Sequence, residues 1–274
     1  MYRIMWLHAP VAQLVEQLTC NQQVVSSNLT GSSKIKRTWH FAKFFCYNEM
    51  MVYSEFVQLL KNNTDKKYAD FSQKLTNSDY VVIGVRVPIL RKLVKAHYHD
   101  ETLPLNDFEL GKYLEVDFSY FAIGLLRCKT AAEQLTFLRK NLCYAKSWMI
   151  TDTITSFLRS VSFEDFWSYF LDTHTDEHVY TRRFAYVFAL KFYREQRILN
   201  ILPYIKSNED YMVSMGQAWL LATIVICYPK VVYDFLFNSA DINLKKKTIS
   251  KIKDSYRIDD ITKNKFVGLR CSCD

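Results

Sequence analysis

The sequence is poor in the residues that make tight turns. Its 274 residues include only 6 Gly and 5 Pro. β-Sandwiches and barrels need a turn between successive short strands, and Gly and Pro supply many of those turns. Their scarcity argues against such folds and favours helices joined by short connections. The one β-like run, YVVIGV (80–85), is short.

A disulfide framework and a membrane span are also missing. The 7 Cys are irregularly spaced without a CxxC pair, and CxC occurs only at Cys271 and Cys273. This pattern fits reduced thiols in a cytoplasm. No basic stretch followed by a long apolar one opens the chain, so no signal peptide is evident. The longest apolar run, AWLLATIVICY (218–228), is too short to cross a bilayer and predicts a buried helix. We therefore expect a cytoplasmic protein without membrane association.

The first fifty residues do not resemble a folded segment. Residues 8–33 read HAPVAQLVEQLTCNQQVVSSNLTGSS, which resembles a transfer-RNA gene translated by mistake. AQLVEQ, TCNQ and VVSSNLT can encode, in order, a D arm, a threonine anticodon loop and a T loop. We expect residues 1–50 to be a spurious or disordered extension, with translation starting at Met50 or Met51. The alternative is an amphipathic leader, because VAQLVEQL has helical spacing.

From Met51 onward, apolar residues recur at helical spacing. The spacing predicts helices over 54–63, 66–75, 87–98, 106–113, 116–128, 130–142, 148–159, 163–171, 178–193, 195–206, 209–227, 230–237 and 241–255. Pairs of helices recur every roughly thirty to forty residues, which is typical of degenerate helical repeats. We predict an all-α, HEAT-like helical-repeat solenoid over 51–267, whose concave face binds an extended partner, followed by a mobile tail at 268–274.

The net charge of +8 suits a polyanionic partner such as DNA. It is equally compatible with a soluble basic protein that binds no nucleic acid. Lys245 to Lys247 are an example, because such a run is usually solvated but is also able to touch a DNA backbone.

One apolar helical segment, KSWMITDTITSF (146–157), carries a carboxylate one turn after an indole. Residues i and i+4 share a helix face, so Trp148 and Asp152 point in the same direction. The pair makes sense if that face lines a cleft for a charged ligand. The alternatives are that Trp148 is a packing residue, and that Asp152 caps a helix or pairs with Arg159 or Lys146.

Several motifs resemble, in order, those of the DNA alkylation repair family, the HEAT-like-repeat alkylpurine DNA glycosylases of AlkD type. The motifs are IGVRVPILRKLVKAHY (83–98), SWMITD (147–152), YTRRFAYVFALKFY (180–193) and QAWLLATIVICYP (217–229). The segment that opens at Met51 resembles the start of these proteins. The resemblance covers about residues 51–267.

The resemblance implies a DNA glycosylase, a hydrolase that excises N3- and N7-alkylated purines from duplex DNA as a monomer without metal or cofactor. It implies Trp148, Asp152 and Trp219 as the catalytic cluster. Arg183 then contacts the DNA backbone, with Arg182 beside it. From the residues alone, Trp219 also suits a core role, and the two arginines suit ion pairs with nearby acidic residues.

The sequence departs from the family pattern directly after Trp219. Active members continue with a charged pair, whereas this chain continues with the apolar and neutral residues of 220–223. The departure indicates a divergent branch. The rival function is a catalytically weak or inactive helical-repeat protein that binds nucleic acid, and a protein–protein scaffold is a third reading.

HTDEH (174–178) spaces two histidines four residues apart. Zinc sites of the HExxH type need Glu directly after the first His, and Thr175 stands there instead. We interpret the motif as a polar helix start and predict no metal site.

Overall fold

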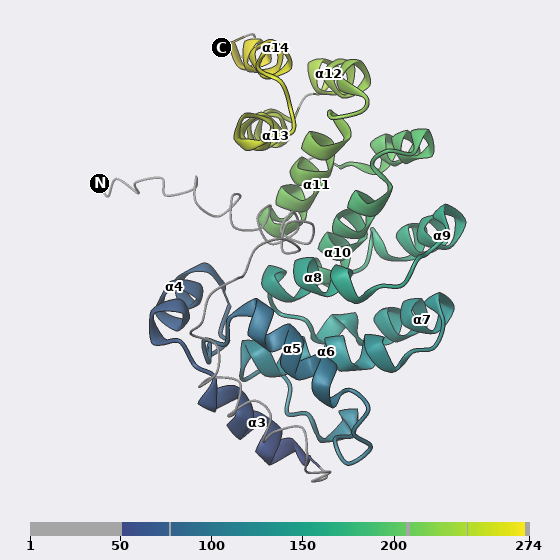
Figure 1. The fold of residues 1–274 in the computed structure, drawn as a ribbon. Coiled ribbons are helices and arrows are strands. Elements are labelled where there is room, and N and C mark those ends of the chain that lie inside the picture. Colours follow the sequence, from purple (N-terminus) through teal and green to yellow (C-terminus); the bar gives the residue numbers. More distant parts are fainter. Residues whose placement is uncertain (1–50, 77, 207–208, 240, 272–274) are drawn as a thin grey trace, which may run out of the picture.

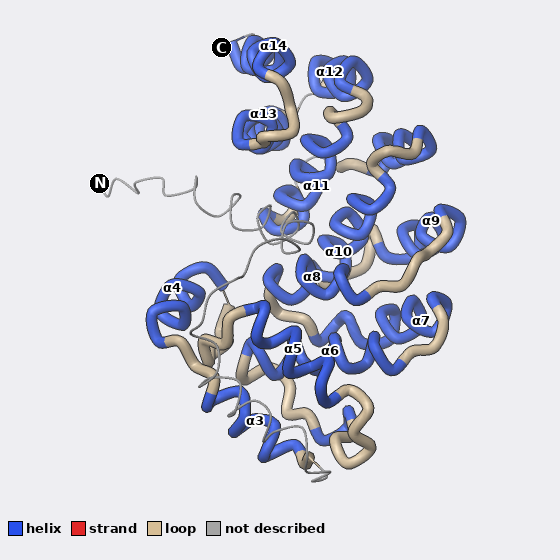
Figure 2. The backbone as a smooth tube through the Cα atoms, viewed as in Figure 1, coloured by secondary structure: helices blue, strands red, loops and turns tan. Residues whose placement is uncertain are grey.

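The structure is a computed structural model, and it describes residues 51–76, 78–206, 209–239 and 241–271. The expectations for residues 1–50 and for Cys273 lie outside this part of the chain. Helices account for most of the described residues, and no β-strand occurs among them (Figure 2). The predicted all-α class is therefore confirmed.

Helices follow one another along the whole described chain. The α-helices are α3 (Tyr53–Asn62), α4 (Lys66–Thr76), α5 (Val87–His97), α6 (Leu114–Arg127), α7 (Ala131–Asn141), α8 (Trp148–Ile154), α9 (Phe163–Thr173), α10 (Val179–Ala189), α11 (Tyr211–Ile224), α12 (Pro229–Asn238), α13 (Ile242–Asp254) and α14 (Asp260–Cys271). Short 3-10 segments are η1 (Leu105–Asp107), η2 (Leu142–Tyr144), η3 (Thr155–Phe157), η4 (Leu190–Phe192) and η5 (Gln196–Tyr204).

The helices stack into a two-layered arc (Figure 1). In the inner layer, α6 packs on α8, α8 on α10, α10 on α11, and α11 on α13. In the outer layer, α7 packs on α9, and α12 on α14. This layered stacking is that of a helical-repeat solenoid, in which each unit buries its apolar face against its neighbours.

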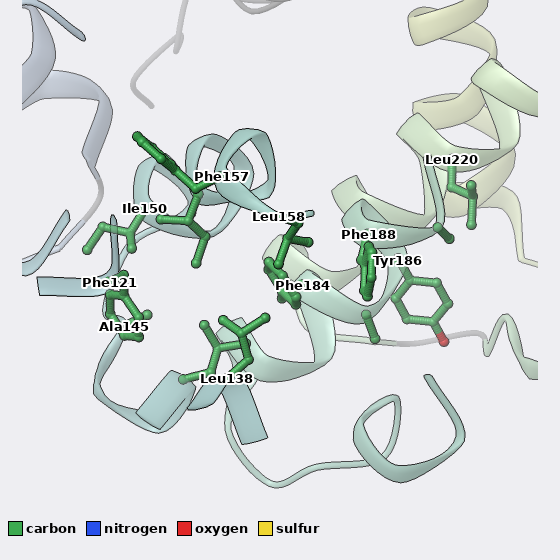
Figure 3. Packing of buried hydrophobic residues seen from close by; sticks show 14 of the residues in the cluster. Phe121, Leu138, Ala145, Ile150, Phe157, Leu158, Phe184, Tyr186, Phe188 and Leu220 are labelled. Carbon is green, nitrogen blue, oxygen red and sulfur yellow. The ribbon is translucent and has the colours of Figure 1, made fainter. Parts of the chain in front are cut away.

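Buried side chains from both layers form the core (Figure 3). Many of them are aromatic, including Phe188, which contacts Phe166 edge-on and Phe184 in a tilted pair. Such pairs add about 0.5–1.5 kcal/mol each beyond the area that they bury. The pair of Phe166 and Phe188 holds α9 against α10, which carries part of the candidate site.

Two segments predicted to be helical do not form α-helices. Residues 106–113 form only the short η1 and a turn at Gly111, where φ is +93°. Residues 196–204 form a 3-10 helix that contains Pro203, since proline cannot donate the hydrogen bond of a regular α-helix. Helix α14 continues through Cys271 and Leu269 is 2% exposed, so the first residues of the predicted tail at 268–274 are helical.

The β-like run at 80–85 forms a loop held by a buried carboxylate. Glu115 accepts hydrogen bonds from the backbone N–H groups of Ile83, Gly84 and Val85, at 2.9, 2.7 and 3.2 Å. Gly84 has φ +97°, and a Cβ there would lie 2.6 Å from the Cβ of Ala69. The loop therefore requires glycine, and only an isolated bridge between Val81 and Tyr113 remains of the strand pattern.

Candidate functional site

Helix α8 begins at the sequence pattern that suggested a site. Ser147 is its N-cap, and the Ser147 hydroxyl accepts a hydrogen bond from the backbone N–H of Met149. Trp148 follows at the first helical position and is half-buried. Its indole Nε1 donates to the carbonyl of Leu75 on α4 at 3.0 Å. The indole is therefore anchored to the amino-terminal helices, and its ring lines an apolar cavity of about 70 Å³ between α4, α5, α6 and α8.

Asp152, one turn further along α8, forms a two-pronged ion pair with Arg183 of α10. Arg183 Nε lies 2.9 Å from Oδ1 of Asp152, and Nη2 lies 2.6 Å from Oδ2. Both side chains are 7% exposed. Thr151 Oγ1 donates a third hydrogen bond to the carboxylate at 3.2 Å. Parallel N–H···O bonds of this kind fix the plane of the carboxylate as well as its position.

Helix α11 completes this arrangement from the other side. Arg183 Nη1 donates to the carbonyl oxygen of Met212 at 2.6 Å. Gly216 of α11 faces Arg183, and a Cβ there would make ordinary van der Waals contact with Arg183 Cγ, at 3.5 Å. The guanidinium therefore links α8 to α11, two helices that sequence spacing alone does not place together.

Trp219 lies on α11 one turn beyond Gly216 and is half-buried. Neither Trp219 nor Trp148 belongs to the buried core of the described residues. The structure thus brings Asp152 and Arg183 into direct contact and places Trp219 on the helix that packs against α10. The residues that follow Trp219 are different, because Leu220, Leu221 and Ala222 are all buried. Buried apolar residues thus stand where the family pattern has a charged pair.

A model of the DNA alkylation repair enzyme family matches residues 56–252. The chain belongs to this family. No curated protein and no solved structure matches it. The match includes all of the residues described above, from the anchored Trp148 to the apolar segment after Trp219.

The expected role of Arg183 in this family member needs correction. A residue that clamps a DNA phosphate needs an exposed guanidinium, whereas Arg183 is 6% exposed and is bound to Asp152 and to the carbonyl of Met212. The alternative partners considered for Asp152, namely Arg159 and Lys146, are not the ones that it binds. Arg183 holds Asp152 in place, and this role was not evident from the sequence because the two residues are 31 positions apart.

Arg182 also forms its hydrogen bonds and its ion pair within the protein. Its Nη1 donates to the carbonyls of Asp176 and Glu177, and its Nε lies 3.5 Å from a carboxylate oxygen of Glu209. The acidic neighbours proposed from the sequence are thus contacted through their backbone. Arg182 therefore fixes the start of α10 rather than presenting a free charge.

A further cation stands beside the ion pair and was not singled out from the lysine run of 245–247. Lys247 of α13 donates to the Ser214 hydroxyl of α11 at 2.8 Å, and its ammonium lies 4.9 Å from the ring centroid of Tyr211. Burial lowers the pKa of Lys247, while Asp241 and Asp210 oppose that shift. Tyr211 is 53% exposed. These residues flank Met212, so the surface beside the ion pair carries a positive charge and an exposed aromatic ring.

The two histidines of HTDEH have structural partners. His178 is the N-cap of α10 and accepts from the backbone N–H of Thr181. His174 stacks on Phe170 and contacts Tyr204 edge-on. The interpretation as a polar helix start is confirmed. In the described part of the chain, no three His, Cys, Asp or Glu side chains gather where they could hold a metal ion, and no helix is long and apolar enough to cross a membrane.

Proposed function

We propose that this member of the DNA alkylation repair enzyme family hydrolyses the N-glycosidic bond of N3- and N7-alkylated purines in duplex DNA. The observation that carries the proposal is the Asp152 carboxylate, which Arg183 holds in a fixed orientation one helical turn from the half-buried Trp148. The proposed site also includes Trp219 on the neighbouring inner-layer helix.

The chemistry needs little from the protein because the substrate is already activated. An alkylated purine carries a positive charge and leaves as a neutral base without being protonated. The sugar becomes an oxocarbenium-like cation as the bond breaks, and a nearby carboxylate stabilises this charge and orients the attacking water. Indole faces stabilise a cation by about 0.5 to 2 kcal/mol each. Asp152, Trp148 and Trp219 are the groups proposed for these roles.

Arg183 acts in this proposal by positioning Asp152. The two hydrogen bonds from Arg183 direct the carboxylate oxygens, so the reacting sugar meets a preorganised charge. The opposite charge of the guanidinium reduces the field of the carboxylate at the sugar. Orientation of the carboxylate is therefore the larger contribution of Arg183. In this proposal, Lys247 beside Met212 supplies the positive charge that binds a flanking phosphate.

A binding protein without catalysis is the rival function, and two observations favour it. The Asp152 side chain is 7% exposed and is neutralised by its partner. The segment after Trp219 packs into the core where active members carry charge. In this reading, the inner layer holds duplex DNA or structured nucleic acid and breaks no bond.

Release of 7-methylguanine from methylated duplex DNA separates the two functions. We expect the wild-type chain to release the base, and Asp152→Asn to abolish release while leaving duplex affinity largely intact. Asp172→Asn is the matched control, because Asp172 also binds an arginine, Arg139, but at an exposed position between α7 and α9. Unchanged release by Asp152→Asn would remove Asp152 from the mechanism.

Absence of release by the wild-type chain, together with salt-dependent duplex binding, would favour the rival function. A protein–protein scaffold would show no salt-dependent DNA affinity at all, because phosphate contacts release counterions and make affinity fall with salt.

A further inference from the structure

Cationic side chains link the carboxyl-terminal ends of successive inner helices. Arg159 donates to the carbonyl of Cys128 after α6, at 3.1 and 3.2 Å, and Lys191 donates to the carbonyl of Leu158 after α8, at 3.2 Å. Carbonyl groups at helix ends have no partner within the helix, and cations bind them favourably. The contacts of Arg159 and Lys191 are therefore explained by helix capping between stacked repeats.

The next contact in the row has no such explanation. Arg194 Nε, after α10, and Arg257 Nη2, after α13, donate to the same phenolic oxygen of Tyr193, at 2.7 and 2.5 Å. The two nitrogens are therefore at most about 5.2 Å apart, the sum of these distances. Both guanidinium groups also lie near the Tyr193 ring, 5.4 and 4.8 Å from its centroid. Two like charges thus meet at one neutral group.

No carboxylate neutralises this arginine pair within the described part of the chain. Arg86, Arg139, Arg182, Arg183 and Arg197 all pair with Asp or Glu, whereas Arg194 and Arg257 pair with neither. Glu195, the nearest acidic residue in sequence to Arg194, binds Arg197 at 2.8 Å. Because both arginines are exposed, an anion has access to them.

The phenol adds a third donor. A tyrosine oxygen offers two acceptor positions and one O–H. When both acceptor positions face guanidinium groups, the O–H points elsewhere and is available to an incoming oxygen. Two guanidinium groups and one hydroxyl converging in this way match the oxygens of a phosphodiester, which arginine binds through paired hydrogen bonds.

We propose that Arg194, Arg257 and Tyr193 form a second DNA-contact site that binds a backbone phosphate, at a distance from the Asp152 ion pair. The inference rests on the proposed DNA substrate. Arg183 and Tyr193 lie ten positions apart along α10 and η4, which corresponds to roughly 15 Å along the helix axis. This length is comparable to the width of the DNA major groove, about 12 Å. In this proposal, a duplex bound at Asp152 reaches the arginine pair with a phosphate away from the reacting nucleotide.

Salt-dependent binding of an undamaged duplex tests the site. Each neutralised phosphate contributes about 0.9 to the slope of log affinity against log salt. The double variant Arg194→Ala/Arg257→Ala should lose about 0.9 of this slope. Wild type should then lose about 3.5-fold more affinity than the variant between about 50 and 200 mM salt. Tyr193→Phe, which keeps both charges but removes the shared oxygen, should weaken binding with a smaller change in slope.

Arg197→Ala is the matched control. It removes one arginine charge only three residues from Arg194, but this charge is already balanced by Glu164 and Glu195. We expect an almost unchanged slope. Thermal unfolding of each variant reports whether the fold is intact, and Arg194→Lys/Arg257→Lys replaces the alanine variant if the latter does not fold. The lysine variant should keep the slope and lose affinity, because lysine cannot form the paired hydrogen bonds.

Wild-type slope and affinity in the folded alanine or lysine variants would overturn the proposal, and so would an equal loss of slope in Arg197→Ala. These outcomes are independent of catalysis. If base release is abolished only by changes at Asp152 and the arginine pair has no effect on binding, the glycosylase proposal stands and the second site does not. If loss of the arginine pair lowers the salt slope but the wild-type chain releases no base, the second DNA-contact site stands and the glycosylase proposal does not.

Discussion

Replacement of Arg183 by methionine tests the ion pair on which the candidate site depends. The change keeps an apolar chain of similar length but leaves the Asp152 carboxylate buried without its partner. Breaking a buried ion pair from one side costs about 3 to 5 kcal/mol of unfolding free energy. For a domain of about 150–250 residues, each kcal/mol lowers the melting temperature by about 2 to 4 °C. We therefore expect Arg183→Met to melt about 6 to 20 °C below wild type.

The double variant Asp152→Asn/Arg183→Met shows whether the loss comes from the uncompensated charge. Because it contains no buried charge at this place, it should recover at least about half of the stability lost in Arg183→Met. The matched control is Arg139→Met, whose ion pair with Asp172 is exposed and should contribute less than about 1 kcal/mol. Urea unfolding measures these four proteins and the single variant Asp152→Asn, which completes the cycle. A loss below about 1 kcal/mol in Arg183→Met, with additive effects in the double variant, would refute a buried, strongly coupled pair.

Three further changes probe the surrounding structure. Gly84→Ala should destabilise the protein by about 2 to 4 kcal/mol in urea unfolding, because φ is +97° and the new Cβ has no room. The control is Gly268→Ala on α14, where the new Cβ meets open space, and this change should be neutral or stabilising. Burial raises the pKa of Asp117 to about 6, above its value of about 3.9 in an unfolded chain. Because the folded protein then binds the proton more tightly, Asp117 stabilises the fold least above about pH 6, and stability is lost as pH rises from about 4 to 6. The unfolding free energy of Asp117→Asn relative to wild type should therefore rise over this range, and a constant difference would contradict the shift. Trp148→Phe should reduce base release by more than tenfold. It should also lower the free energy of unfolding by about 1 to 2 kcal/mol, since it loses the hydrogen bond to Leu75. An unchanged rate of base release would exclude Trp148 from the site.

Much of the fold was predictable because helices are determined by local spacing. Eleven of the predicted segments overlap α-helices of the structure, including the segment at 148–159, which forms α8 and η3. Two segments whose backbone departs from their local pattern are held by carboxylates of α6. Residues 80–85 have a strand-like composition, but the Glu115 carboxylate binds their backbone N–H groups and holds them as a loop. Gly111 donates its backbone N–H to Asp117 and turns the chain where a helix was expected.

The candidate site was only partly predictable for the same reason. The face shared by Trp148 and Asp152 follows from their spacing of four residues. The partner of Asp152 does not, because Arg183 comes from another helix. No motif marks the carbonyl of Met212, and the sequence shows Lys247 only as part of a lysine run, without its contacts to Ser214 and Tyr211.

Residue type and local spacing are enough to predict the helical class, the repeat-like succession of helices and the order of the family motifs. Which charged side chains are paired within the protein and which are exposed depends on how the helices pack. Arg183, predicted to bind DNA, is buried against Asp152, whereas Arg194 and Arg257, which no motif marks, converge on one tyrosine without an acidic partner in the described chain. The physical reason is that a charge acts on whatever lies within a few ångströms of it, and helix stacking sets those neighbours.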